Sequence, residues 1–341
     1  MRLLSPWAEA HVRMLERECV RAGLTLRILT YGEEHRRPFY LDRYGNGFGT
    51  VPGAGDALGF VVWTVGPPYS IRMALDELRS YKKPVAVLDE EGTHDLASMT
   101  AGNRLARVFR FSSTEQPSRD LARFLYIRGH RSVAFISALH KSRWSRVRCD
   151  ELTREFAGYG PQWSVNPFTI DTHDSPESHF NDGRLNDAVS GLLHAGLSAD
   201  LARRGVPVGL PIGTFIERCR QGCVDIMQQE VIAGRLVPLF ESALKNRNIT
   251  AWVCAQDSVA VSALSFLKRR EIAVPGMISV AGFDDSPDAL RHDLTSVNFN
   301  LDGLVHAMLS HVRYPKFAPG EGGAVEIESV VMERGSSGRA R

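Results

Sequence analysis

The sequence predicts an α/β protein of two lobes, each a doubly wound parallel sheet with helices on both faces. Short apolar runs of strand length alternate with segments of helical periodicity along the chain. The strand-like runs are continuously apolar, as in sheets that are buried on both faces. The chain has 341 residues, more than one domain core usually fills, and it holds too many strands for one sheet. Two lobes therefore fit the pattern better than one.

The first half of the chain opens with a helix. Ser5 and Pro6 are typical of a helix start, and Gly23 is typical of a helix end. The strands expected here are 24–29, 59–64, 84–89, 106–111 and 132–137, with helices at 70–81 and 117–128. Residues 32–56 are rich in Gly, Pro and Arg and are expected to form a loop.

The second half continues the alternation. The helices expected here are 144–157, 185–204, 213–246, 257–270 and 300–313. The strands expected here are 165–170, 250–255, 277–283, a short extended segment at 294–299 and a last strand at 324–332. The polar tail 334–341, rich in Gly and Ser, is expected to fray.

Composition and charge exclude several classes of protein. With 41 Lys and Arg against 39 Asp and Glu, the net charge of +2 is not that of a strongly basic nucleic-acid coat or of an acidic disordered chain. No apolar run approaches the roughly 18 residues of a membrane-spanning helix, and the first residues lack the apolar core of a secretory signal. Five cysteines without dense spacing make no disulfide framework, which indicates a reducing compartment. A cytoplasmic protein is expected.

The sequence contains none of the common enzyme signatures. It lacks a G-x-S-x-G elbow, a G-x-x-x-x-G-K-[ST] phosphate loop and an H-E-x-x-H zinc motif. Cys219 and Cys223 share a helix face, but no nearby pair would complete a zinc site, so buried structural thiols are favoured. The spacing of His173 and His179 with neighbouring aspartates matches no calcium loop, and a solvated loop is favoured there. We therefore expect neither an enzyme nor a resident metal or cofactor.

Polar residues follow the carboxyl ends of several predicted strands, where parallel sheets bind ligands. Arg148 lies near the start of one helix, Gln256 and Asp257 follow one strand, and Asp284 and Asp285 follow another. Together an arginine, an amide and a carboxylate would hold a small polyhydroxylated or acidic ligand. Each also has a plainer interpretation: a surface charge for the arginine, a helix cap for Asp257 and a turn for the aspartate pair.

Two tryptophans stand at positions where an aromatic ring can stack on a ligand. Trp63 ends a buried strand, and Trp144 opens a helix. Aromatic residues at such positions more often belong to the core, so both interpretations stay open.

Several phrases, taken together, resemble the effector-binding core of the lactose-repressor-like (LacI/GalR) transcription regulators. They are, in chain order, IRGHRSVAFIS (127–137), SRVRCDELTREFAGYG (145–160), TAWVCAQDSVAVSALSFLKRREIAVPGMISVAGFDDSPDA (250–289), LTSVNFNLDGLVHAML (294–309) and VVMERGSS (330–337). The likeness covers about 78–337 and is weak over 30–57 and 160–250. Ordered motifs over this length are more specific than any single motif.

The resemblance implies a type 1 periplasmic-binding-protein fold with three crossover segments. The N-terminal lobe would hold residues 1–128 and 298–313, and the C-terminal lobe 129–297 and 314–341. A small effector, a sugar or a related polar metabolite, would bind between the lobes and close them.

The resemblance also assigns ligand-binding positions. Arg148 matches the family's effector-holding arginine, and Asp284 matches the acid of the GFDD phrase. Gln256 takes the place of a frequent Asn. Two departures make a standard hexose pattern doubtful: Gln116 stands where many members carry Asp, and Phe299 stands where a polar residue often reaches the ligand.

Members of this family regulate transcription as dimers through an N-terminal helix-turn-helix, which we do not find before residue 24. We expect this chain to be the sensor of a homodimeric regulator, with a helix-turn-helix or a winged (GntR-type) reader outside it. The alternative is a solute-binding protein of a transport system with the same fold.

Overall fold

The computed structural model describes residues 6–34, 37–42, 44–64, 67–89, 94–112, 115–170, 191, 203, 233–315 and 324–341. The chain folds into two compact units. The first holds Met1–Pro117 and Asn298–Val330, and the second holds Ser118–Val297 and Val331–Arg341. The chain therefore passes between the units three times, as the sequence predicts. The α/β class is confirmed.

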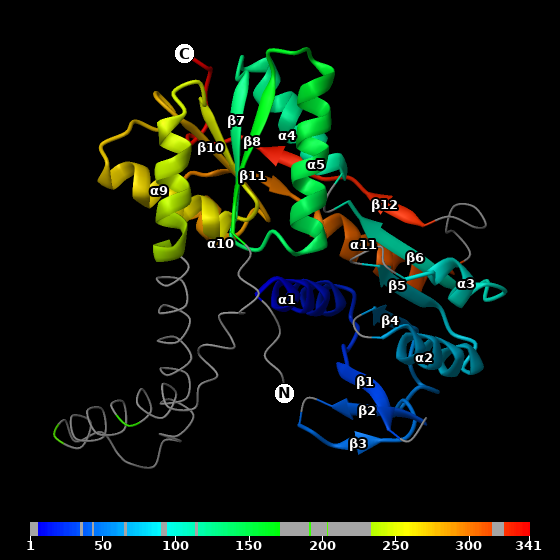
Figure 1. The fold of residues 1–341 in the computed structure, drawn as a ribbon. Coiled ribbons are helices and arrows are strands. Elements are labelled where there is room, and N and C mark those ends of the chain that lie inside the picture. The colour runs from blue at the N-terminus through cyan, green and yellow to red at the C-terminus, as the bar shows by residue number, and fades with distance from the viewer. Residues whose placement is uncertain are drawn as a thin grey trace. The chain divides into compact units, whose positions relative to one another are not determined.

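The first unit is built on a parallel sheet of order β12-β6-β5-β4 (Figure 1). Its strands are β4 (Phe60–Trp63), β5 (Val85–Asp89), β6 (Ala106–Phe111) and β12 (Val325–Ile327). Its helices are α1 (Pro6–Arg21), α2 (Pro68–Ser80), α3 (Leu96–Thr100) and α11 (Leu301–Arg313). Helix α11 packs on β4, β5 and β6, and α1 packs on α11. Fully buried Val87 and Ile71 lie in the core that results.

Residues 24–56 differ from the prediction of one strand and a loop. They contain an antiparallel sheet of β1 (Leu29–Glu34), β2 (Arg37–Asp42) and β3 (Gly47–Phe48). Buried Tyr40 anchors this sheet to helix α2, because its hydroxyl donates to Glu77 Oε2 at 2.7 Å. Tertiary packing therefore fixes strands that the polar composition conceals.

The second unit carries a six-stranded sheet of order β13-β11-β10-β9-β7-β8. Its strands are β7 (Ser132–Ser137), β8 (Ser164–Thr169), β9 (Ala251–Cys254), β10 (Ser279–Phe283), β11 (Thr295–Asn298) and β13 (Val330–Met332). Its helices are α4 (Glu115–Ile127), α5 (Arg143–Gly158), α9 (Asp257–Arg269), α10 (Pro287–Arg291) and a helix over residues 233–245. Strands β8, β7, β9, β10 and β11 are all parallel.

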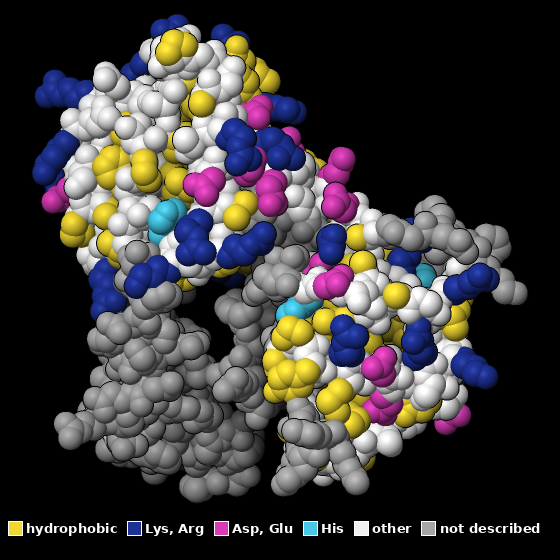
Figure 2. Space-filling model, turned by 45° about the vertical axis from the view of Figure 1, so that its right-hand side comes forward, with side chains coloured by type: hydrophobic (Ala, Val, Ile, Leu, Met, Phe, Trp, Pro, Cys, Tyr) yellow, Lys and Arg dark blue, Asp and Glu magenta, His cyan; other side chains and the backbone are white. Residues whose placement is uncertain are grey.

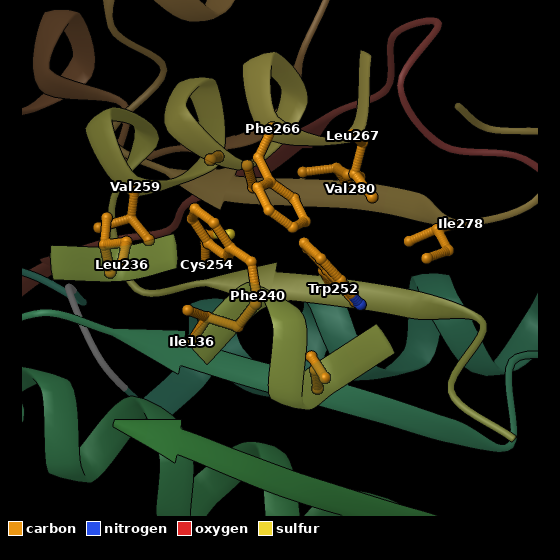
Figure 3. Packing of buried hydrophobic residues seen from close by; sticks show 14 of the residues in the cluster. Ile136, Leu236, Phe240, Trp252, Cys254, Val259, Phe266, Leu267, Ile278 and Val280 are labelled. Carbon is orange, nitrogen blue, oxygen red and sulfur yellow. The ribbon is translucent and has the colours of Figure 1, made fainter. Parts of the chain in front are cut away.

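The core of the second unit is rich in aromatic side chains. Trp252 on β9 is fully buried between Phe240, whose ring centroid lies 5.5 Å away, and Phe266 of α9 (Figure 3). Burying rings of this size supplies much of the driving force for folding. The second unit therefore has an aromatic core of its own.

The two units differ from the expected lobes in two segments. Residues 118–128 group with the second unit, where Arg119 and Arg123 of α4 pair with Glu151 and Glu155 of α5. Residues 314–330 group with the first unit, because β12 pairs in parallel with β6. The exact lobe boundaries given by the resemblance remain a proposal.

The expected last strand, 324–332, is two strands in two sheets. Strand β12 adds to the sheet of the first unit and β13 to that of the second. Between them, Ser329 donates through its N–H and hydroxyl to Gln116 Oε1, at 3.1 and 2.9 Å. One continuous strand-like run of sequence thus contains a passage from the first unit to the second, and no turn residue in the sequence indicates it.

The tail does not fray, contrary to the prediction. Ser336 and Ser337 are buried, and Ser336 Oγ donates to Val280 O and accepts from Thr295 N, both at 2.7 Å. The hydroxyls that make the tail look solvated satisfy buried backbone groups instead.

The surface carries charges of both signs. On the face that Figure 2 draws, basic and acidic side chains of the described residues are interspersed. None of the described helices is both long enough and apolar enough to span a bilayer.

Candidate functional site

Polar side chains gather at the carboxyl edge of the sheet in the second unit. Strands β7, β9, β10 and β11 run parallel, so their carboxyl ends share this edge. The loops and helices that follow them carry the arginine and aspartates that the sequence singles out.

Arg148 of α5 is the central cation of this edge. Only 5% of the residue is exposed. Its Nη1 donates to Ala255 O at 2.7 Å and lies 4.0 Å from Asp284 Oδ1. Burial lowers the pKa of this guanidinium to about 10, although the nearby carboxylates of Asp284 and Asp257 act in the opposite direction. Arg148 remains charged at neutral pH.

Aromatic faces enclose the guanidinium. Its central carbon lies 4.6 Å from the ring centroid of Phe283 and 5.0 Å from that of Trp144. Such stacking stabilises a cation that has left water. Trp144 therefore contacts the arginine in this structure, while its predicted role against a ligand remains a proposal.

Asp284 follows β10 directly, in an uncommon backbone conformation. Its φ is +107°, and its N–H donates to Val297 O at 3.0 Å. Burial raises the pKa of its carboxyl to about 7, and Arg148 opposes that rise. Its side chain remains 28% exposed, so the carboxyl is accessible from solvent.

Asp257 is a second carboxyl at the same edge and is almost fully buried. Its Oδ1 accepts from Ser296 Oγ at 2.6 Å and its Oδ2 accepts from Ser286 N at 2.7 Å. Burial raises its pKa to about 6. A Cβ on Gly282 would lie 2.3 Å from Asp257 Oδ1, so this glycine leaves room for the carboxylate. Asp257 connects the loop after β10 to strand β11 and does more than the helix cap that the sequence suggests.

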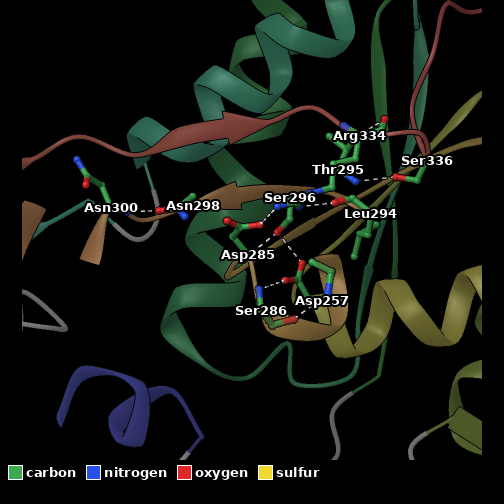
Figure 4. A network of polar contacts seen from close by, with 11 residues as sticks. Asp257, Asp285, Ser286, Leu294, Thr295, Ser296, Asn298, Asn300, Arg334 and Ser336 are labelled. Atoms are coloured by element: carbon green, nitrogen blue, oxygen red, sulfur yellow. Dashed lines mark hydrogen bonds and ion pairs between the residues drawn. The ribbon is translucent and has the colours of Figure 1, made fainter. Parts of the chain in front are cut away.

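A connected network surrounds this carboxyl (Figure 4). The N–H of Asp285 donates to Ser296 Oγ at 3.0 Å, and its carboxylate pairs with Arg334 Nη2 at 2.6 Å. Sequence reasoning singles out neither Ser296 nor Arg334. Their only signal is membership of the LTSVNF and VVMERGSS phrases.

Gln256 lies beside this cluster. It immediately precedes Asp257 at the start of α9, and its carbonyl accepts from Ala260 N at 3.1 Å. Its side chain makes no capping hydrogen bond. Of the seven predicted ligand-binding residues, Arg148, Asp284 and Trp144 lie together, and Gln256 adjoins them through Ala255.

The other three predicted residues belong to the first unit. Gln116 uses its amide oxygen to hold Ser329. The Trp63 ring lies 5.2 Å from that of His11, and its carbonyl accepts from the Tyr31 hydroxyl. Phe299 is only 2% exposed. A role of these three in binding remains a prediction.

The predicted structural thiols and the histidine loop cluster lie outside the described residues. This applies to Cys219, Cys223, His173 and His179. Among the residues that the structure describes, no group of three His, Cys, Asp or Glu side chains could hold a metal ion.

Comparisons with known proteins agree with this architecture. A family model described as a periplasmic binding protein-like domain matches residues 214–316. Over 298 residues the chain is 26% identical to an HTH-type transcriptional regulator of Mycolicibacterium smegmatis, and the match covers 86% of this chain and 65% of that relative. The chain therefore carries a periplasmic-binding-protein-like domain over residues 214–316. It spans less than two thirds of the relative's length.

Solved structures share the fold of this chain. A dimeric Lac repressor with a C-terminal deletion superposes with a TM-score of 0.53 at 14% identity, covering 98% of this chain and 96% of that one. A LacI family regulator from Enterococcus faecium, with bound ribose, gives 0.53 at 12% identity, covering 99% and 96%. At these identities the likeness concerns the fold.

Proposed function

We propose that the chain is the ligand-sensing part of a transcription regulator and that its ligand binds at the carboxyl edge of the second unit. One observation carries the proposal: Arg148, a buried guanidinium, lies beside the partly exposed carboxyl of Asp284. Burying such a charge is costly unless it is paired, and burial of perturbed ionisable groups at a sheet edge is typical of functional sites.

The chemistry of the edge favours a small neutral ligand with several hydroxyl groups. Arg148 supplies donors and Asp284 an acceptor, a combination suited to a vicinal pair of hydroxyls. Because Asp284 and Asp257 already oppose the charge of Arg148, an anionic ligand would have to compete with them. The ribose bound to the Enterococcus regulator supports a sugar.

Regulation is the second part of the proposal. A ligand that binds one conformation of the two units better than another shifts their populations. We propose that this shift alters DNA binding by a helix-turn-helix of a longer, homodimeric protein, as the name of the Mycolicibacterium relative and the dimeric Lac repressor suggest. Similarity to regulators does not favour the transport alternative, and we propose no catalytic turnover.

The test is a thermal-shift screen of the chain with pentoses, hexoses, disaccharides and sugar acids. A ligand that binds only the folded state raises the Tm by mass action. We expect at least one neutral sugar to raise the Tm of the wild type, and Arg148→Ala to abolish the rise.

The matched control is Arg146→Ala. Arg146 lies two residues away on the same helix, but it is exposed, and its side chain donates to Lys141 O. We expect Arg146→Ala to keep the wild-type response. Equal sugar responses in the two variants would contradict the assignment of Arg148, and a wild type that responds to no sugar would contradict the ligand class.

A further inference from the structure

The tail segment 333–341 places an arginine beside the ligand-binding edge. Arg334 Nη2 pairs with Asp285 Oδ1 at 2.6 Å, and its Nη1 donates to Leu294 O at 2.7 Å. The side chains of Arg334 and Asp285 are only 14% and 11% exposed. The planar guanidinium thus bonds two segments at once and is largely withdrawn from solvent.

The backbone of Arg334 is equally fixed. Its N–H donates to Thr295 Oγ1 at 2.9 Å, and the same hydroxyl donates to Arg334 O at 3.0 Å. Thr295 begins β11, so the arginine is attached to a central strand of the sheet. Arg334 therefore offers Asp285 a partner whose position is set by the sheet.

Asp285 belongs to a turn that needs support. Asp284 and Asp285 are consecutive residues with positive φ, +107° and +46°, and neither is glycine. Residues with a Cβ keep such conformations only where their surroundings enforce them. Three backbone N–H groups hold this turn by hydrogen bonds. Asp284 N–H donates to Val297 O, Asp285 N–H donates to Ser296 Oγ, and Ser286 N–H donates to Asp257 Oδ2.

The ion pair between Arg334 and Asp285 holds the same turn through the Asp285 side chain. Its partner, Asp285, is the immediate neighbour of Asp284, and the position of the Asp284 carboxyl beside Arg148 depends on the turn backbone. A change at Arg334 is therefore transmitted to Asp284 without direct contact with a ligand.

We propose that Arg334 is a positioning residue for the ligand-binding edge, which fixes the turn 284–285 through Asp285 and so directs Asp284 toward Arg148. This inference rests on the proposed function only in treating that edge as the place where ligand binds. It assigns a role in the site to the tail of the chain.

The experiment is amide hydrogen exchange on the whole chain for the wild type, R334Q and D285N. Without the ion pair the turn should open locally, so exchange at Asp285 and Ser286 should be at least tenfold faster in both variants. Exchange at Val253 and Ala281, on the neighbouring strands β9 and β10, should stay at the wild-type rate. A conservative R334K variant keeps the charge but not the planar guanidinium, so its exchange rates at Asp285 and Ser286 should lie between those of the wild type and R334Q.

A second measurement distinguishes an effect on the position of Asp284 from a general effect on stability. A carboxyl titration of Asp284 by carbon NMR should show its pKa falling by at least one unit in R334Q, because the freed side chain turns toward water. The groups that face it, Arg148 and Asp257, are unchanged in this variant.

R341Q is the matched control. Arg341 lies on the same tail and donates to the carbonyl of Met277, which lies at the opposite end of β10 from the turn. We expect wild-type exchange at Asp285 and Ser286 in R341Q. Equal exchange in R334Q and R341Q, loosening spread over β9 and β10, or an unchanged titration of Asp284 would each overturn the proposal. If R334Q does not fold, D285N and R334K answer the same question.

The readouts separate this inference from the proposed function. Exchange and titration need no ligand, so they test the positioning role even if no sugar binds. In the sugar screen, R334Q should weaken the response of any sugar that raises the Tm of the wild type. Failure of every sugar on the wild type counts against the proposed function alone.

Discussion

Individual residues at the ligand-binding edge combine charges that burial makes costly. Arg148 keeps its charge despite a lowered pKa, while the pKa values of Asp284 and Asp257 are raised by burial. Opposing shifts of this kind show that desolvation, more than pairing, governs the two carboxyls. Burial of these ionisable groups therefore lowers the folding stability, and it holds them in fixed positions at the edge.

The raised pKa of Asp284 predicts how the folding stability depends on pH. The folded protein binds a proton at Asp284 up to about pH 7, whereas an unfolded chain loses it near 3.8. The stabilisation from this carboxyl is complete below about pH 3.8 and is lost as the pH rises through 7. Asp284→Asn mimics the protonated acid, so the stability of the wild type relative to this variant should fall by roughly 4 kcal/mol between pH 4 and 8.

Denaturant unfolding at a series of pH values measures this difference. Comparing the two proteins removes the contribution of His130 and His311, whose pKa values are lowered by burial and which act in the opposite direction. Asp288→Asn, at an exposed carboxylate paired with Arg291, is the control and should leave the pH profile of the wild type unchanged. A constant difference between wild type and Asp284→Asn would contradict the prediction.

At this scale, the sequence predicts which residues follow the strands but not what they contact. Arg148 and Asp284 are found where the alternation of strands and helices puts them. The partners of Asp257 are Ser286 and Ser296, which are 29 and 39 residues away, and the periodicity of the sequence marks neither serine. Contacts over such distances depend on strand order, which periodicity alone does not determine.

Among the elements, buried apolar strands are predicted well, and polar strands that form only through tertiary contacts are predicted poorly. Strand β5 is a fully buried apolar run, and its sequence predicts it almost to the residue. Strand β1 is polar and forms only because β2 pairs with it and Tyr40 anchors the sheet. The tail was expected to fray, since serine and glycine carry no apolar signal. Its order comes from hydrogen bonds to β10 and β11.

The tail's order gives an element-scale prediction. Ser336→Ala removes the acceptor of the Thr295 N–H and the donor to Val280 O inside the second unit. An unsatisfied buried amide costs about 1–3 kcal/mol, so the variant should be destabilised by that amount. Urea unfolding followed by circular dichroism measures the loss.

Ser262→Ala is the control for this prediction. Ser262 lies on α9 and its hydroxyl only bonds the carbonyl of Ser258 in the preceding turn. Its replacement should change stability by a few tenths of a kcal/mol at most. Equal, small effects of the two substitutions would mean that the tail contributes little to the folded unit.

The molecule as a whole consists of two units with separate cores. The first core is built on Ile71 and its aliphatic neighbours, and the second on Phe240, Trp252 and Phe266. Two lobes are predicted by length and strand number alone. Their limits are not, because β12 and β13 divide one apolar run between two sheets.

Separate cores predict separable unfolding. Truncation of a buried Ile or Phe to Ala costs about 2–5 kcal/mol within its own core. In calorimetry we expect two components, one shifted to lower temperature by Ile71→Ala and the other by Phe240→Ala. In a variant that keeps Trp252 as its only tryptophan, the fluorescence should follow only the component that Phe240→Ala moves. A sugar held mainly by Arg148 should raise that same component first, since binding stabilises the unit that contacts the ligand. A single transition shifted equally by both substitutions would instead mean that the units unfold as one cooperative body.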